Sequence, residues 1–226
     1  MYEIIPSPGT ENKDFSEIEK KLAVVKSFAK TIHIDVVDGK YASTTTFSDP
    51  HPFERYAKSL SNGDTGFIFE VHLMVEDPIK HLNAWADAGF QRFIGQIEKM
   101  PDQEEFVAQA QLLGEVGLAI DKHTSIDDLK VPFEDLDCLL VMTIQAGASG
   151  QTFEEELVQK VRELHEKTTI PIEVDGGIND ETIEIAEAAG ASRFVVTSFL
   201  FNNVESPEKQ FQILKNKLDA LKELTR

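Results

Sequence analysis

The sequence predicts an α/β protein with a (β/α)8 TIM barrel, and three observations support this fold class. Short apolar, β-branched runs alternate along the whole chain with longer charged segments of helical period, which is the pattern of a parallel sheet. Eight such runs are present. The length of 226 residues lies within the range of about 200 to 250 that these barrels commonly occupy. A doubly wound open sheet is the alternative that the same pattern allows.

Each strand candidate is a short run of apolar and β-branched residues between polar or turn-forming segments. In chain order, the eight candidates are residues 3–6, 31–37, 67–74, 92–97, 117–120, 138–144, 171–174 and 193–196. The helix candidates between them have apolar residues at helical spacing, and they are 14–30, 78–88, 154–167, 180–189 and 206–224. No Pro-, Gly- or Ser-rich linker interrupts the alternation, so we expect a single domain over residues 1–226.

Several helix ends carry residues that favour starting or stopping a helix. Asp77, which precedes a proline, and either Asn179 or Asp180 are candidates for N-caps. Gly89 and Gly190 follow helix candidates, where a glycine readily takes the left-handed conformation that ends a helix. These residues support the predicted boundaries on both sides of two helices.

The chain is strongly acidic, with 22 Lys and Arg against 40 Asp and Glu and a formal net charge of −18. Such a surface does not attract nucleic acid or an anionic membrane, so we expect neither as a partner. No apolar run approaches the roughly 20 residues of a membrane span, and the N-terminal residues lack the pattern of a signal peptide. We therefore expect a cytoplasmic protein.

The chain has one cysteine, Cys138, so no disulfide can form within it. Cys138 lies in an apolar run of a predicted strand. Free cysteines are among the residues most often buried, and a buried thiol is inert. We expect Cys138 to be a packing residue and not a nucleophile.

Polar residues interrupt three of the strand candidates in a way that an apolar core does not favour. In the second strand, His33 and Asp35 alternate with apolar residues, and the period of two places both on one face. His72 in the third strand and Asp175 in the seventh occupy similar alternating positions near the strand ends. Because both faces of a barrel strand are covered, we expect all four side chains to point inward at the end where barrel active sites lie.

These four residues predict a metal site. A buried carboxylate without a partner is costly, so a cation is expected beside Asp35 and Asp175. One such histidine alone would more often be a hydrogen-bonded core residue, but two His and two Asp at matching strand ends suit a divalent transition metal. Zn, Fe, Mn and Co all suit this ligand set, so the identity of the metal stays open.

Two glutamates lie one layer deeper on the same strand faces. Glu70 stands two residues before His72, and Glu173 stands two residues before Asp175. They could be acceptors that orient the metal ligands, or they could form deep hydrogen bonds to neighbouring strands. The sequence leaves both interpretations open.

Several segments resemble, in the same order, the motifs of the ribulose-phosphate 3-epimerase family. The segments are 6–7 (PS), 33–39 (HIDVVDG), 71–75 (VHLMV), 141–144 (VMTI) with 147–151 (GASGQ), and 174–177 (VDGG). They resemble the family's PS, HxDxMDG, VHLMV, LMSVxPGFGGQ and VDGG motifs. One motif alone would be weak support, but the ordered set spans nearly the whole chain and contains both histidines.

The resemblance implies a barrel of the ribulose-phosphate-binding type and an activity. A family member inverts C3 of a ketose phosphate, D-ribulose 5-phosphate to D-xylulose 5-phosphate in the pentose phosphate pathway, through a cis-enediolate. By the same resemblance, His33, Asp35, His72 and Asp175 bind the metal. Asp35 and Asp175 are then the two acid/base groups, and they exchange roles when the direction reverses.

The resemblance also implies contacts to the substrate. The residues expected around the phosphate are Gly147, Ala148, Ser149, Gly150, Gly176, Gly177, Thr197 and Ser198. Ser7, His72 and Asp175 would reach the sugar, while Met74 and Met142 would line the reaction intermediate. Glycines allow the backbone to approach an anion closely, which suits a phosphate site.

The chain departs from the family pattern around these residues. The departures are Val37 for a Met, residues 41–44 (YAST) for FVPN, 146–150 (AGASG) for PGFGG, Thr197 for a Gly, Gln96 for a common His, and 8–13 (PGTENK) for the usual SILSAD. They spare the metal and acid/base residues but change the lining of the site. D-allulose 6-phosphate therefore stays open as the substrate, as does a barrel that binds a sugar phosphate without catalysis.

A decarboxylase of the orotidine- or keto-gulonate-phosphate type is the other enzyme class that uses a similar barrel. Those enzymes have a DxKxxD motif after a strand, and residues 70–76 (EVHLMVE) contain no lysine. Related barrels are commonly dimers or hexamers, so a homo-oligomer is a further expectation.

Overall fold

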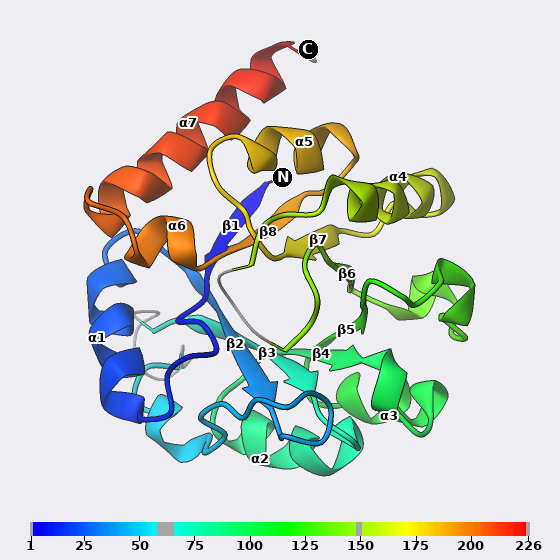
Figure 1. Ribbon diagram of the computed structural model, residues 1–226. Helices are drawn as coiled ribbons and strands as arrows, with labels where there is room; N and C mark the ends of the chain where they lie inside the picture. The colour runs from blue at the N-terminus through cyan, green and yellow to red at the C-terminus, as the bar shows by residue number, and fades with distance from the viewer. Residues whose placement is uncertain (1, 58–65, 148–150, 225–226) are drawn as a thin grey trace.

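Eight parallel strands form a nearly closed barrel in this protein (Figure 1). The structure is a computed structural model that describes residues 2–57, 66–147 and 151–224. The strands are β1 (Glu3–Pro6), β2 (Thr31–Val37), β3 (Ile68–Met74), β4 (Arg92–Gln96), β5 (Glu115–Ile120), β6 (Cys138–Met142), β7 (Ile172–Asp175) and β8 (Arg193–Val196). The predicted barrel is confirmed, and the predicted strand boundaries differ from these by two residues or fewer.

The strands follow one another around the barrel, and the last returns to the first. Each strand from β2 to β7 is hydrogen-bonded to the next along the chain, and β8 pairs with β1. Side chains bridge the remaining seam between β1 and β2: the Thr31 hydroxyl donates to Glu3, and the Ser7 hydroxyl donates to Asp35 Oδ2 at 3.2 Å. The doubly wound open sheet is therefore wrong.

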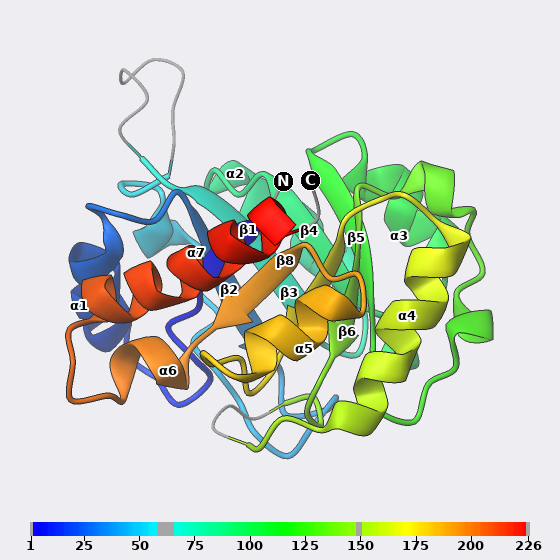
Figure 2. The same cartoon turned by 90° about the horizontal axis from the view of Figure 1, so that it is seen from above.

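Helices surround the barrel (Figure 1). The α-helices are α1 (Phe15–Val25), α2 (Leu82–Asp87), α3 (Gln103–Ala110), α4 (Val158–Lys167), α5 (Thr182–Ala188), α6 (Ser198–Phe201) and α7 (Pro207–Leu224). Short 3-10 turns are η1 (His51–Phe53), η2 (Pro78–His81), η3 (Ile97–Lys99), η4 (Ile126–Asp128), η5 (Phe133–Asp135) and η6 (Glu155–Leu157). Figure 2 shows α7 running across the barrel, where it contacts α1, α5 and α6.

The connection between β5 and β6 contains no α-helix, and none was predicted there. Between β5 and β6 the chain forms only η4 and η5, because Pro132 interrupts this short connection. The predicted helix 14–30 ends at Val25, where a turn leads into β2. α3 was not predicted, although Asp102 caps it by accepting a hydrogen bond from Glu105 N at 3.0 Å.

The capping predictions have mixed outcomes. Asn179 Oδ1 accepts from the amides of Glu181 and Thr182 at 2.8 and 3.0 Å, and Gly89 and Gly190 have φ values of +89° and +108°. The two glycines act as predicted, whereas α5 begins at Thr182 with Glu181 as its N-cap, so Asn179 bonds the turn that leads into the helix. The side chain of Asp77 makes no capping hydrogen bond, because the chain enters a 3-10 turn at Pro78 instead of a regular α-helix.

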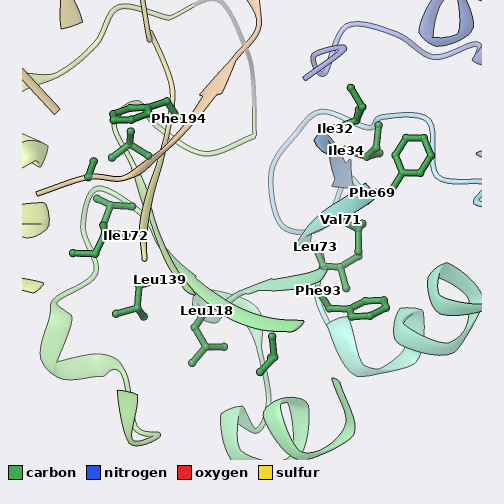
Figure 3. Close-up of a cluster of buried hydrophobic side chains, with 14 of the residues drawn as sticks. Ile32, Ile34, Phe69, Val71, Leu73, Phe93, Leu118, Leu139, Ile172 and Phe194 are labelled. Carbon is green, nitrogen blue, oxygen red and sulfur yellow. The ribbon is translucent and has the colours of Figure 1, made fainter. Parts of the chain in front are cut away.

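The main core lies between the outward faces of the strands and the helices. Figure 3 shows part of it, with Ile34, Val71, Phe93 and Leu139 among the outward-facing side chains. A smaller apolar cluster fills part of the barrel interior and includes Cys138, which is fully buried as predicted. Burial raises the pKa of the Cys138 thiol. Buried polar side chains, among them His33, Glu70 and Glu173, lie in another part of the interior.

Candidate active site

The four predicted ligands converge inside the barrel toward the carboxyl ends of β2, β3 and β7. Asp35 pairs with His72 in the register of β2 and β3, and all four side chains are buried. Asp35 Oδ1 lies 3.2 Å from His33 Nε2 and 3.3 Å from His72 Nδ1, while Asp175 Oδ2 lies 4.0 Å from His33 Nε2. One ligand atom from each residue lies within 4.8 Å of all the others.

The geometry of this group fits a metal ion. Glu70 Oε1 lies 2.7 Å from His33 Nδ1, so in a neutral ring Nδ1 carries the proton and Nε2 presents its lone pair toward Asp35. His72 Nδ1 is buried and has no hydrogen-bond partner. A divalent cation bound between these nitrogens and carboxylates would satisfy atoms that otherwise repel one another.

A second group, which His33 forms with Glu70 and Glu173, also has atoms at metal-binding distances. It lies one layer deeper, and its carboxylates are fully buried. The Arg92 guanidinium already donates to Glu70 Oε2 and so supplies a cation there. The group of His33, Asp35, His72 and Asp175, whose two aspartates border a cleft, is therefore the better metal site.

Both glutamates lie where the sequence placed them, one layer below the aspartates. Glu70 contacts His33 and so stands where an orienting acceptor would. Glu173 Oε1 lies 3.4 Å from His33 Nδ1, and neither of its carboxylate oxygens has a hydrogen-bond partner. Burial and the nearby Glu70 raise the pKa of Glu173 to about 7, whereas Arg92 and His33 outweigh the burial of Glu70 and lower its pKa to about 2.

The two aspartates differ in their preferred protonation. Burial and the charge of Asp35 raise the pKa of Asp175 to about 7. Burial acts in the same direction on Asp35, but His33 and His72 outweigh it and hold the pKa of Asp35 well below its usual range. Near neutral pH, without a metal, Asp35 is therefore ionised while Asp175 still holds its proton over part of the range.

These shifts predict how the stability of the metal-free protein depends on pH. Unfolded Asp and Glu release their protons near their ordinary pKa values, about 4, whereas folded Asp175 and Glu173 keep theirs until about pH 7. The folded state thus binds more protons in this window, and the free energy of unfolding falls as pH rises from about 4 to 7. Urea unfolding in the presence of a chelator measures the free energy of unfolding at pH 5 and at pH 8. The fall between the two pH values should be smaller for Asp175→Asn than for wild type. Equal falls in wild type and Asp175→Asn would contradict the raised pKa of Asp175. Asp87→Asn, on the exposed face of α2, is the control and should fall as wild type does.

A cleft opens above the two aspartates. It is lined by Thr10, Asp35, Met74, Met142, Ile144, Gly147, Asp175, Gly176, Gly177, Ile178, Val195, Thr197 and Ser198. Both methionines, both aspartates and the glycines of two predicted loops thus border one space. Positive φ values of +104°, +122° and +66° at Gly147, Gly176 and Gly177 explain why glycine occupies these positions.

Other predicted residues lie elsewhere. Ser7 and His72 are fully buried behind Asp35 and do not border the cleft. The Ser7 hydroxyl bonds to Asp35, so its contact in this structure is with a carboxylate. Ala148, Ser149 and Gly150 lie outside the described residues.

Several residues of the site were not among the predicted site residues, and three of them are Thr10, Arg92 and Gln96, of which Gln96 was noted only as a departure from the family pattern. Thr10 borders the cleft from the loop after β1. Gln96 Oε1 lies 2.6 Å from His72 Nε2, and Arg92 contacts Glu70. Arg92 and Gln96 alternate on β4 as His33 and Asp35 do on β2, so the period of two was a usable signal.

Comparisons with known proteins agree with the motifs. Residues 7–201 match the sequence model of the ribulose-phosphate 3 epimerase family. The ribulose-phosphate 3-epimerase of Schizosaccharomyces pombe is 33% identical over 208 residues, covering 90% of this chain and 89% of that protein. The enzyme of the same name from Bacillus subtilis is 30% identical over 203 residues, covering 86% and 91%.

A solved structure gives a likeness in fold. The 3-keto-L-gulonate-6-phosphate decarboxylase from Vibrio cholerae superposes with a TM-score of 0.68 at 14% identity, covering 97% of each chain. At this identity the likeness concerns the barrel alone. Among the described residues, none of the helices has the length and apolar character needed to cross a membrane.

Proposed function

This chain belongs to the ribulose-phosphate 3-epimerase family, a family of isomerases, and we propose that it converts D-ribulose 5-phosphate to D-xylulose 5-phosphate by inverting C3. The observation that carries the proposal is the pair Asp35 and Asp175. Both border one cleft and come from different strands, β2 and β7, and in the metal-free site their protonation preferences are opposite. A two-base epimerase needs one ionised and one protonated carboxyl group.

The chemistry follows from the position of C3 next to a carbonyl. The C3 proton is acidic because its removal gives a cis-enediolate, and inversion requires that a proton return to the opposite face. In the proposed assignment, Asp35 accepts the proton from one face and Asp175 donates a proton to the other. The roles reverse for the opposite direction. Met74 and Met142 would line the intermediate with polarizable apolar surface.

His33, Asp35, His72 and Asp175 would hold one divalent metal ion in the proposed enzyme. The ion would act as a Lewis acid that stabilises negative charge on the enediolate oxygens. The chain's own contribution is to hold two imidazoles and two carboxylates at matching depths. Zn, Fe, Mn and Co remain alternatives for its identity.

The substrate phosphate would bind at the other part of the cleft. Gly147, Gly176 and Gly177 border it with backbone that no Cβ shields, and Thr197 and Ser198 lie beside them. Backbone N–H groups in such positions bind anions without a basic side chain. This arrangement allows a protein with a net charge of −18 to hold one phosphate.

The proposal is tested by following the C3 proton in D2O. Purified protein is incubated with D-ribulose 5-phosphate, with and without a chelator, and with metal restored. We expect C3 exchange and formation of D-xylulose 5-phosphate in the metal-replete sample and neither after chelation. D-Allulose 6-phosphate is run in parallel, and turnover of it alone would replace the proposed substrate. If a sugar phosphate binds through its phosphate group but neither sugar exchanges its C3 proton, the non-catalytic alternative would be favoured.

We further propose that the protein acts in the cytoplasm as a single-domain homo-oligomer with a small sugar phosphate as its ligand. A rice relative that is 29% identical bears the name ribulose-phosphate 3-epimerase, cytoplasmic isoform. Sedimentation of the purified protein would give the oligomeric state, and a monomer at micromolar concentration would remove that part of the proposal.

A further inference from the structure

We infer that Gln96 is a positioning residue that presents the Nδ1 atom of His72 to the metal, and that Glu98 determines which end of the Gln96 amide faces His72. The inference rests on the proposed metal site, but it concerns residues that the proposed mechanism does not use. It makes a specific statement about His72: the ring would offer Nδ1 to the metal, whereas His33 would offer Nε2.

Gln96 is the last residue of β4, and it is fully buried beside His72. Its Oε1 atom lies 2.6 Å from His72 Nε2, and its Nε2 atom donates to Glu98 Oε2 at 2.8 Å. The amide therefore joins the inside of the barrel to the loop that follows β4. Both of its ends are therefore engaged in hydrogen bonds.

Glu98 fixes the orientation of that amide. A carboxylate can only accept hydrogen bonds, so the NH2 end of Gln96 must face Glu98 and the oxygen end must face His72. Glu98 is itself held in place, since Oε1 accepts from the Asp121 amide at 2.7 Å and Oε2 accepts from the Tyr41 hydroxyl at 3.2 Å. Three donors, one at the end of β4 and two in other connections, thus converge on one carboxylate.

The orientation of the amide determines the tautomer of His72. Because the Gln96 oxygen accepts, Nε2 of a neutral His72 ring must carry the hydrogen, and Nδ1 is left with its lone pair. Nδ1 lies 3.3 Å from Asp35 Oδ1 and has no hydrogen-bond partner. Glu70 acts in the same way on His33 but at the other nitrogen, Nδ1. In the neutral form that a metal ligand requires, both rings would direct an unprotonated nitrogen at the same carboxylate oxygen.

The test exchanges the two polar groups. Gln96→Met removes the acceptor, and Glu98→Gln allows the Gln96 amide to turn over. The double variant Gln96→Glu/Glu98→Gln restores the pattern, with a carboxylate toward His72 and an amide toward residue 96. Affinity for Co²⁺ and Zn²⁺ is measured by competition with a chromophoric chelator. The tautomer of His72 is measured by 15N NMR of the histidine rings, of which the chain has six.

We expect Gln96→Met to weaken metal binding about 10- to 100-fold and the double variant to stay within roughly threefold of wild type. In wild type, His72 should be the Nε2–H tautomer, and in Gln96→Met both tautomers should be populated. A wild-type His72 with its hydrogen on Nδ1, unchanged affinity in Gln96→Met, or a wild-type protein that binds neither metal would overturn the inference.

The readouts separate this inference from the proposed reaction. Metal affinity and the tautomer are measured without substrate, so a protein that binds metal as described but leaves D-ribulose 5-phosphate unchanged would refute only the proposed function. If Gln96→Met does not fold, as judged by circular dichroism, Glu98→Gln and the wild-type tautomer still decide the outcome. A residue with a merely structural role would change stability without moving the tautomer.

Discussion

Asp175→Asn should lower kcat for the interconversion of the two pentulose phosphates by roughly 10²- to 10⁴-fold, the usual contribution of a general acid/base group. The amide cannot hold or release the proton that the proposed mechanism requires on one face of C3. Asp175 borders the same cleft as Asp35 but comes from β7, not β2, so it is placed to serve the second face of C3. The rate is measured by NMR at saturating substrate and metal.

The same variant distinguishes a two-base mechanism from a one-base mechanism. With Asp35 intact, the epimer whose C3 proton faces Asp35 should still exchange that proton slowly with D2O, without inversion. The other epimer should not exchange. Asp87→Asn, on the exposed face of α2, should leave both rates unchanged. Interconversion by Asp175→Asn within tenfold of wild type would show that Asp175 is not one of the two groups.

The period of two was enough to predict the inner face of the barrel. His33 and Asp35 alternate with apolar residues on β2, and the structure confirms that both point inward, next to His72 and Asp175. That prediction required only the geometry of a strand and the rule that barrel sites lie at the carboxyl ends. It did not require knowledge of which residues face each other across strands.

Contacts that depend on register could not be predicted in this way. The bond between Arg92 and Glu70 exists because the two residues are aligned across β3 and β4, and one sequence does not show that alignment. The contact between Gln96 and His72 likewise joins neighbouring strands. Short helices were also missed: α3 has eight residues and a weak apolar stripe, so its periodicity is hard to distinguish from a loop.

Arg92→Met should lower the free energy of unfolding by about 3 to 5 kcal/mol, because it leaves a buried carboxylate without its cation. Glu70 is fully buried, and the Arg92 guanidinium donates to it and to Glu115 Oε2, the latter at 2.7 Å. Methionine keeps most of the volume of the side chain but none of its charge. Urea unfolding at pH 7 measures the loss.

Two further variants show whether the lost free energy of unfolding comes from the unpaired charge of Glu70. Arg92→Met/Glu70→Gln removes the carboxylate of Glu70 together with the guanidinium of Arg92. It should therefore recover part of the stability that Arg92→Met loses. Arg55→Met is the matched control, since Arg55 donates to Glu19 at 2.7 Å but is exposed, and its loss should not exceed about 1 kcal/mol. If Arg92→Met costs no more than Arg55→Met, the interior of this barrel tolerates an unpaired carboxylate. Arg92 would then not be what keeps Glu70 ionised beneath the proposed metal ligands.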